Sequence, residues 1–186
     1  LRLIAGTLPA HAESLPESPE LHALNAACRQ MEEMVASMAD FYSLATGDLA
    51  DQGASFDVCA MLAELVQSRQ PRARAVGQYL GALLPSGSAK IVSDRTLLSR
   101  VISNLLENAF THGRPGGRVT VTLQQEESTV RISVEDDGPG FSPDFELTQS
   151  GARRAKGEGQ GIGLLFCARA VRALGGRLAV HDGPGG

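Results

Sequence analysis

The sequence is poor in several residue types, and each scarcity excludes a class of protein. It has no tryptophan, aromatic residues make up 4% of its 186 residues, and Lys90 and Lys156 are its only lysines. No run of about 18 apolar residues occurs, so we expect no membrane contact by this chain. The first residues, LRLIAGTLPAHAES, lack the apolar core of a signal peptide.

Basic charge and cysteine are also scarce. The net charge is −4, with 2 basic and 7 acidic residues in 1–50 and 15 basic and 14 acidic residues in 51–186. Neither part has the basic field that nucleic-acid binding needs, so nucleic acid is not an expected partner. Cys28, Cys59 and Cys167 lie far apart and form no metal-binding spacing. We expect reduced, buried thiols and a cytoplasmic location.

What is present is the composition of a globular chain. Hydrophobic residues make up 42% and charged residues 20%, so wholesale disorder is excluded. The length suits one ordinary domain, or a small domain with an appendage. Glycine is frequent, at 21 residues, and its clusters prove informative.

Residues 20–46 are predicted to form one long amphipathic helix. From Leu21 to Leu49, apolar residues recur at alternating spacings of three and four, which is a heptad seam. Ser18 and Pro19 suit the start of a helix, and Gly47 suits its end. A helix with a single apolar stripe needs partner helices to cover it.

The N-terminal segment is therefore expected to be a helical hairpin. Residues 1–8 suit the end of a truncated first helix, and residues 9–19 suit a connecting loop. Two such hairpins would form a dimeric four-helix bundle. The alternative is that the helix packs only on its own chain. We expect a dimerisation hairpin over 1–50 and a second domain over 51–186.

The second domain is predicted to be a two-layer α/β sandwich with helices over a mixed sheet, which makes the fold class α+β. Asp94 is the expected N-cap of its strongest helix. The expected elements are a helix from Val58 that ends before Pro71, strands at 78–83 and 89–92, a helix at 95–112, paired strands at 119–123 and 130–134, a helix at 161–174 and a strand at 177–181.

The helix at 95–112 carries a polar arc opposite its apolar side. Asn104, Glu107, Asn108 and Thr111 fall within this arc, and His112 lies at its edge. Asparagine is unfavourable inside a helix, so its repetition suggests a ligand site. Amide and carboxylate oxygens suit Mg²⁺. The alternative is a merely solvated face.

Two glycine clusters follow. Asp136-Asp137-Gly138-Pro139-Gly140 comes after a strand pattern, where glycines let the backbone approach a flat ligand and a carboxylate can accept from an amino group. The alternative is a simple turn. The second cluster, residues 157–163, leads into an apolar helix whose N-terminal N–H groups would attract phosphate. It is neither a Walker loop nor a Rossmann fingerprint. Basic residues before it, Lys156 among them, suit either a lid over phosphates or an exposed loop.

The order and spacing of these motifs resemble a known family. N-L-L-E-N-A-F-T-H at 104–112, D-D-G-P-G at 136–140 and G-E-G-Q-G-I-G-L at 157–164 resemble the N, G1 and G2 boxes of the ATP-binding domain of sensor histidine kinases. That domain has the Bergerat-type fold of the superfamily that includes gyrase, the Hsp90 chaperones and MutL. The resemblance covers about residues 55–182, and a dimerising hairpin precedes this domain in histidine kinases.

The resemblance implies a role for each matching residue. Asn108 would bind the Mg²⁺ that bridges the ATP phosphates, with Asn104 nearby, and Glu107 would polarise the attacking nucleophile. Asp136 would accept a hydrogen bond from the adenine amino group. The remaining expected ATP-binding residues are His112, Gly138, Gly140, Lys156, Gly159, Gly161 and Gly163, with residues 141–158 as the lid.

The implied activity is transfer of the γ-phosphoryl group of Mg-ATP to a histidine, followed by relay to an aspartate of a response-regulator receiver domain. The family's His-Glu/Asp-Leu-Arg-x-Pro segment is absent, so the acceptor is expected upstream of this chain. Thr111 stands where the family usually has lysine or arginine, and Asp137 where asparagine is common. The alternative is a non-catalytic module that dimerises and binds a receiver domain. The resemblance leaves open whether the whole protein is anchored in a membrane, as such kinases often are.

Overall fold

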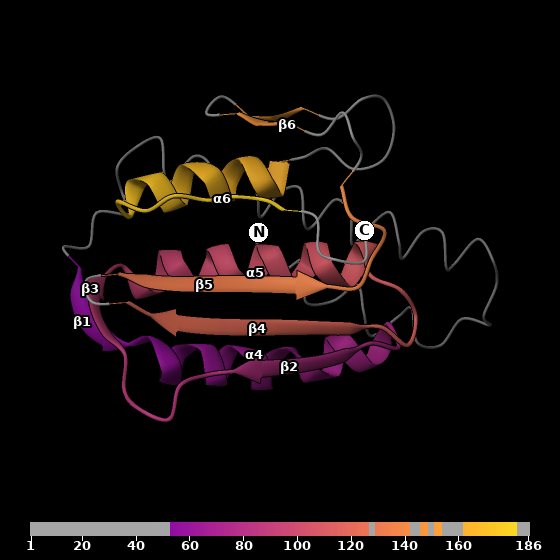
Figure 1. The fold of residues 1–186 in the computed structure, drawn as a ribbon, viewed down its shortest axis with the longest axis horizontal. Coiled ribbons are helices and arrows are strands. Elements are labelled where there is room, and N and C mark those ends of the chain that lie inside the picture. The colour runs from indigo at the N-terminus through magenta and orange to yellow at the C-terminus, as the bar shows by residue number, and fades with distance from the viewer. Residues whose placement is uncertain (1–52, 127–128, 142–145, 149–150, 154–161, 182–186) are drawn as a thin grey trace, which may run out of the picture. The chain divides into compact units, whose positions relative to one another are not determined.

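The computed structural model describes residues 53–126, 129–141, 146–148, 151–153 and 162–181 (Figure 1). All of them belong to one compact unit, Ala39–Gly186. The predicted hairpin of residues 1–50 lies outside the described residues. So do Lys156, Gly159 and Gly161.

A three-stranded mixed sheet is the centre of the fold. Its strands are β2 (Tyr79–Leu83), β4 (Arg118–Gln125) and β5 (Val130–Asp136), in the order β2-β4-β5. β2 runs parallel to β4, and β4 runs antiparallel to β5. The predicted mixed sheet and its strand pair are confirmed.

Two smaller pairs of strands flank this sheet. β1 (Ala54–Asp57) pairs antiparallel with β3 (Lys90–Ser93), and β6 (Glu146–Thr148) pairs antiparallel with β7 (Gly151–Arg153). The sequence predicted β3 but not β1, β6 or β7. Strands of three or four residues are too short to show a clear alternation of apolar and polar side chains.

Helices cover one face of the sheet. α4 (Val58–Ala75) and α5 (Arg95–His112) lie behind the strands in Figure 1, and α6 (Ile162–Ala173) packs against α5. Every second residue of β4 points into the core between these layers: Val119, Val121 and Leu123 are all buried. Phe166 and Cys167 of α6 are fully buried in the same core. In the described residues, the two layers of helices over a mixed sheet are therefore as predicted.

Aspartates begin the two long helices. Asp94 Oδ1 accepts the Leu97 N–H at 2.8 Å, which confirms the predicted cap of α5. Asp57 Oδ1 accepts the N–H groups of Cys59 at 2.9 Å and of Ala89 at 3.1 Å. One carboxylate thus caps α4 and also fixes the segment that enters β3.

The prediction that the first helix of this domain ends before Pro71 is wrong, because α4 continues to Ala75. Proline removes one helical N–H, at a cost of about 3 kcal/mol or more. Contacts hold the turn after it: Ala73 is fully buried, and Arg72 pairs with Glu107 of α5. The tertiary contacts thus outweigh the local effect of proline.

The predicted strand at 177–181 is also not found, because these residues form no strand in the structure. Alternation of apolar side chains is not enough for a strand, which also needs a hydrogen-bonded neighbour. Leu178 nevertheless packs on the core. No helix in the described ranges is long and apolar enough to cross a membrane.

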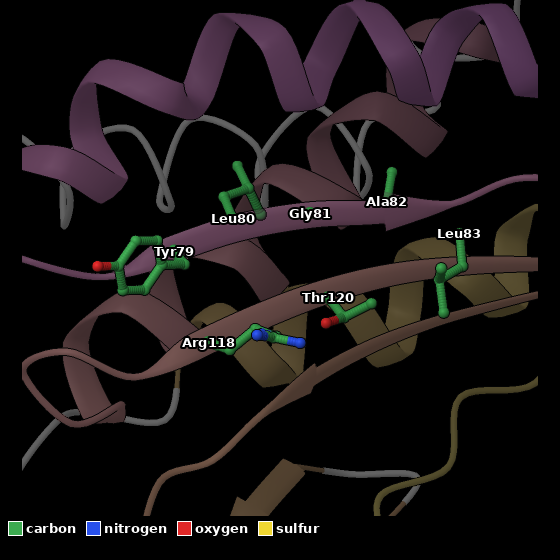
Figure 2. Close-up of a pocket in the computed structure, with 7 residues that line it drawn as sticks. All are labelled: Tyr79, Leu80, Gly81, Ala82, Leu83, Arg118 and Thr120. Atoms are coloured by element: carbon green, nitrogen blue, oxygen red, sulfur yellow. The ribbon is translucent and has the colours of Figure 1, made fainter.

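The other face of the sheet is open along β2. Tyr79 and Leu83 are exposed there, and Gly81 between them leaves a groove that Arg118 and Thr120 of β4 also line (Figure 2). Of the predicted site residues that the structure describes, none lines this groove.

Candidate functional site

Asn104 and Asn108 of α5 lie beside the first turn of α6. A Cβ placed at Gly163 would be 3.4 Å from Asn104 Oδ1 and 3.9 Å from Asn108 Oδ1. The packing of α5 against α6 thus brings together two motifs that are more than fifty residues apart in the sequence. A Cβ at 163 would be in van der Waals contact with both asparagine side chains.

The two asparagines differ in how their amide groups are satisfied. Asn104 Nδ2 donates to the Arg100 carbonyl at 3.0 Å. Asn108 Nδ2 is buried and has no hydrogen-bond partner among the described residues. A buried, unsatisfied polar group costs about 1–3 kcal/mol, and in a native protein it usually marks a water, ion or ligand position. Asn108 therefore fits a residue that contacts a bound ligand.

Glu107 faces a different helix. Its Oε1 lies 3.1 Å from Arg69 Nη1 and its Oε2 lies 3.2 Å from Arg72 Nε, so both oxygens are held by α4. The polar arc, predicted to be one narrow face toward a ligand, is instead divided between two neighbours: Glu107 is 60° from Asn104 around the helix axis and faces α4. The structure does not place Glu107 with Asn108 at Gly163. Arg69 and Arg72 of α4 hold the Glu107 side chain in this direction, and neither belongs to a motif found in the sequence.

Asp136 and Gly138 form a tight turn against the end of α5. Asp136 ends β5, and its Oδ1 accepts the Gly138 N–H at 2.8 Å. Gly138 is buried, and a Cβ there would be only 2.9 Å from the His112 carbonyl oxygen. Gly140 has a φ of +75°, which favours glycine. The close approach at Gly138 is to the end of α5, so the expected approach of Gly138 and Gly140 to a flat ligand stays a prediction. The Asp136 side chain is exposed.

His112 joins this turn through its backbone. It is the last residue of α5, and its carbonyl oxygen is the group that leaves no room at Gly138. The structure thus brings His112 and Asp136 to the same end of the site. Asn104, Asn108 and Gly163 form the neighbouring group along α5.

Two further residues support the Asp136 end and were not predicted. Asp137 Oδ2 accepts the Arg118 N–H at 3.0 Å. Gln78 is 6% exposed, and its Nε2 donates to the Phe110 carbonyl at 3.2 Å. In the sequence, Asp137 stood out only because it occupies the position where the resembled family commonly has asparagine. Gln78 gave no sequence signal.

The side chains of the candidate site fit one mode of magnesium binding and not another. The described residues contain no group of three or more His, Cys, Asp or Glu side chains that could hold a metal ion. Mg²⁺ usually keeps several waters and binds few protein ligands together with substrate phosphates. A single amide such as Asn108 is consistent with that mode, and a metal cage made only of protein ligands is not.

Comparison with known proteins identifies the family. Residues 93–186 match the family described as histidine kinase-, DNA gyrase B-, and HSP90-like ATPase. The alginate biosynthesis sensor protein KinB of Pseudomonas aeruginosa is 31% identical over 176 residues, covering 91% of this chain and 29% of KinB. The signal transduction histidine-protein kinase BaeS of Escherichia coli K12 is 32% identical over 148 residues, covering 75% of this chain and 31% of BaeS. The chain spans less than a third of either relative.

Solved structures share the fold. Histidine kinase AdeS of Acinetobacter baumannii superposes with a TM-score of 0.64 at 17% identity, covering 92% of this chain and 83% of AdeS. Full-length ShkA in complex with AMPPNP gives a TM-score of 0.64 at 24% identity, covering 88% of this chain and 36% of ShkA. The chain belongs to the histidine kinase-, DNA gyrase B- and HSP90-like ATPase family, and sensor histidine kinases are its relatives.

Proposed function

We propose that residues 51–186 bind Mg-ATP as the catalytic domain of a two-component sensor histidine kinase. The observation that carries this proposal is the buried Asn108 amide, unpartnered among the described residues, beside Gly163 at the start of α6. Helix N-termini favour phosphate because their N–H groups are free and the helix dipole is positive there. The unpartnered Asn108 Nδ2 is a donor and suits a phosphate oxygen, while Asn108 Oδ1, which faces Gly163, is the atom that would bind Mg²⁺.

Some residues of the site would contact the adenine base, and the others would contact the phosphates and Mg²⁺. Asp136 would accept a hydrogen bond from the adenine amino group, with Gly138 and Gly140 letting the backbone pass close to the ring. Asn108 would hold Mg²⁺, with Asn104 beside it, and Gly163 would leave room for the phosphates at α6. We extend the proposal to Lys156, Gly159 and Gly161, which lie outside the described residues, and to His112. The resemblance would put His112 near the phosphates, whereas its backbone lies beside Gly138 at the Asp136 end.

The proposed reaction forms a bond between an imidazole nitrogen of an acceptor histidine and the γ-phosphorus, and breaks the bond from that phosphorus to the oxygen of ADP. Mg²⁺ supplies charge neutralisation on the phosphates. The protein binds and orients the nucleotide. We assign no chemical step to Glu107, because both its oxygens are already held by Arg69 and Arg72.

For residues 1–50 and for the partner protein, the proposal is based on the similarity to sensor kinases. Residues 1–50 would dimerise as a helical hairpin, and the phosphoryl group would pass to an aspartate of a response-regulator receiver domain in the cytoplasm. KinB and BaeS are named as a sensor protein and a signal transduction kinase. The absence of the acceptor motif predicts that residues 1–186 acquire no stable acid-labile phosphoryl group when incubated with labelled Mg-ATP.

Calorimetric titration of Mg-ATP tests the core of the proposal. The unsubstituted chain should bind, and Asp136→Ala should weaken binding at least about tenfold, since it removes the acceptor for the adenine amino group. Glu135→Ala is the matched control, because it removes the neighbouring exposed carboxylate, which accepts from Ser133 Oγ. If the unsubstituted chain binds no ATP, the non-catalytic docking module replaces the kinase domain as the better explanation.

A further inference from the structure

We propose that Asp137 is a positioning residue, which sets the selectivity of the site for adenine by fixing the end of β5 that carries Asp136. It does so through its hydrogen bond to the Arg118 N–H at the start of β4. This inference rests on the proposed function, since it concerns the base-binding part of the same site. Asp137 itself contacts no ligand in the proposal.

The first step is the place of Asp137 relative to the sheet. The pairing of β4 with β5 ends at Val119 opposite Asp136. The next backbone N–H of β4, that of Arg118, is accepted at 3.0 Å by the Asp137 side chain. The carboxylate thus extends the strand pairing by one residue beyond the last backbone pair, at the point where β5 leaves the sheet.

The second step is the close fit around this carboxylate. Gly117 is buried, and a Cβ there would collide with Asp137 Oδ1 and would lie 2.7 Å from the Arg114 carbonyl oxygen. The Gly117 carbonyl in turn accepts the Tyr79 N–H at 2.8 Å. Asp137 is therefore anchored to a turn that is itself tied to β2, and not to a loosely held loop.

The third step connects this anchor to Asp136. Asp136 lies between the strand pairing on one side and Asp137 on the other, and its Oδ1 is oriented by the Gly138 N–H at 2.8 Å. Gly138 in turn sits against the His112 carbonyl. Without the Asp137 bond, the last residue of β5 is free to separate from β4, and the Asp136 carboxylate loses its fixed direction. A site 1 Å too loose loses affinity and selectivity.

The test compares binding of Mg-ATP and Mg-GTP to the full chain, because adenine and guanine differ at the amino group that Asp136 would recognise. Asp137→Ala should weaken ATP binding about fivefold to tenfold, which is the size of one ordinary hydrogen bond, and should lower the ATP-to-GTP preference. Asp137→Asn keeps an acceptor oxygen and should restore ATP affinity to within about twofold of the unsubstituted chain. Glu135→Ala controls for the lost charge.

Amide hydrogen exchange at Arg118 gives a readout that needs no nucleotide. Protection of this amide should fall in Asp137→Ala and persist in Asp137→Asn. The inference is overturned if Asp137→Ala keeps the ATP affinity and the ATP-to-GTP preference of the unsubstituted chain, if Glu135→Ala matches its loss, or if Asp137→Asn is as weak as alanine. Failure of the unsubstituted chain to bind ATP would instead overturn the proposed function, and this inference with it.

Discussion

Glu107 and Asn108 are adjacent on α5, yet they face different helices. Glu107 is held by Arg69 and Arg72 of α4, whereas Asn108 lies beside Gly163 of α6. One helix thus uses one side chain to dock onto its neighbour and the next to line the candidate site. This division separates the expected effects of substituting the two residues.

Glu107→Gln should reduce stability while leaving nucleotide binding nearly intact. The Glu107 side chain is 29% exposed and that of Arg69 is 33% exposed, so solvent screens the ion pairs. We expect a loss of about 0.5–2 kcal/mol in the free energy of unfolding, measured by urea denaturation. The dissociation constant for Mg-ATP should change by no more than about twofold. A large loss of ATP binding at unchanged stability would show that Glu107 acts in the site.

Gly138→Ala should disturb both the turn and the site. The added methyl group would lie 2.9 Å from the His112 carbonyl oxygen and 2.5 Å from Asp136 Oδ1. We expect a destabilisation of about 1–3 kcal/mol and weaker ATP binding, because the backbone must shift. Gly87→Ala is the matched control: a Cβ at Gly87 meets nothing within 4 Å, so its effect should stay within about 0.5 kcal/mol. Equal stability of the two variants would contradict the close approach at Gly138.

The stability of the domain should fall in acid partly through Asp57. Burial alone would raise the pKa of this carboxyl group, but hydrogen bonds from Ser88 and from the backbone of Ala89, Cys59 and Ala60 bring the pKa below its ordinary value of 3.8. A lowered pKa means that the folded state binds this proton less readily than the unfolded state. The resulting stabilisation is present above pH 3.8 and is lost as the pH falls through the lowered pKa.

Urea denaturation between neutral pH and pH 3 measures this contribution. Asp57→Ala should lower stability at neutral pH and make its decline in acid shallower than in the unsubstituted protein. Asp57→Asn keeps an acceptor for the cap but does not titrate, so it should show the same shallower decline with a smaller loss at neutral pH. An unchanged acid dependence in both variants would show that Asp57 does not contribute.

Cys167 should stay unreactive in the folded protein. Burial raises the pKa of its thiol to about 12. At pH 8 only roughly one thiol in ten thousand is then the reactive thiolate. Mass spectrometry after treatment with iodoacetamide should find Cys167 unmodified under native conditions and modified in urea. Rapid native modification would contradict its place in the core between α5 and α6.

Much of the catalytic-domain fold was predictable because its elements carry strong local signals. Asp94, the apolar stripe of α5 and the alternation in β4 each specify an element without help from distant residues. The exceptions depend on distant contacts. Pro71 stays inside α4 because of burial and an ion pair. Residues 177–181 have the alternation of a strand but form no strand in the structure.

The candidate site shows the same limit. Asparagine is unfavourable inside a helix, which singled out Asn104 and Asn108. The roles of the asparagines, Asp136 and the glycines came from the resemblance to the N, G1 and G2 boxes and remain predictions. The pairing of Glu107 with α4 was not predictable, since helical periodicity does not say which neighbour covers the edge of an arc. Gln78 and Asp137 support the backbone through single hydrogen bonds, for which the sequence offers no pattern.

The magnesium dependence of ATP binding tests the central claim most directly. Titrations of ATP into the full chain and into Asn108→Ala, each with Mg²⁺ and with EDTA, give four dissociation constants. We predict that Mg²⁺ tightens ATP binding to the unsubstituted chain at least about tenfold and that Asn108→Ala loses most of this gain, because Asn108 Oδ1 would bind the ion. No ATP binding by the unsubstituted chain, or an equal gain from Mg²⁺ in both proteins, would contradict a magnesium nucleotide site at Asn108.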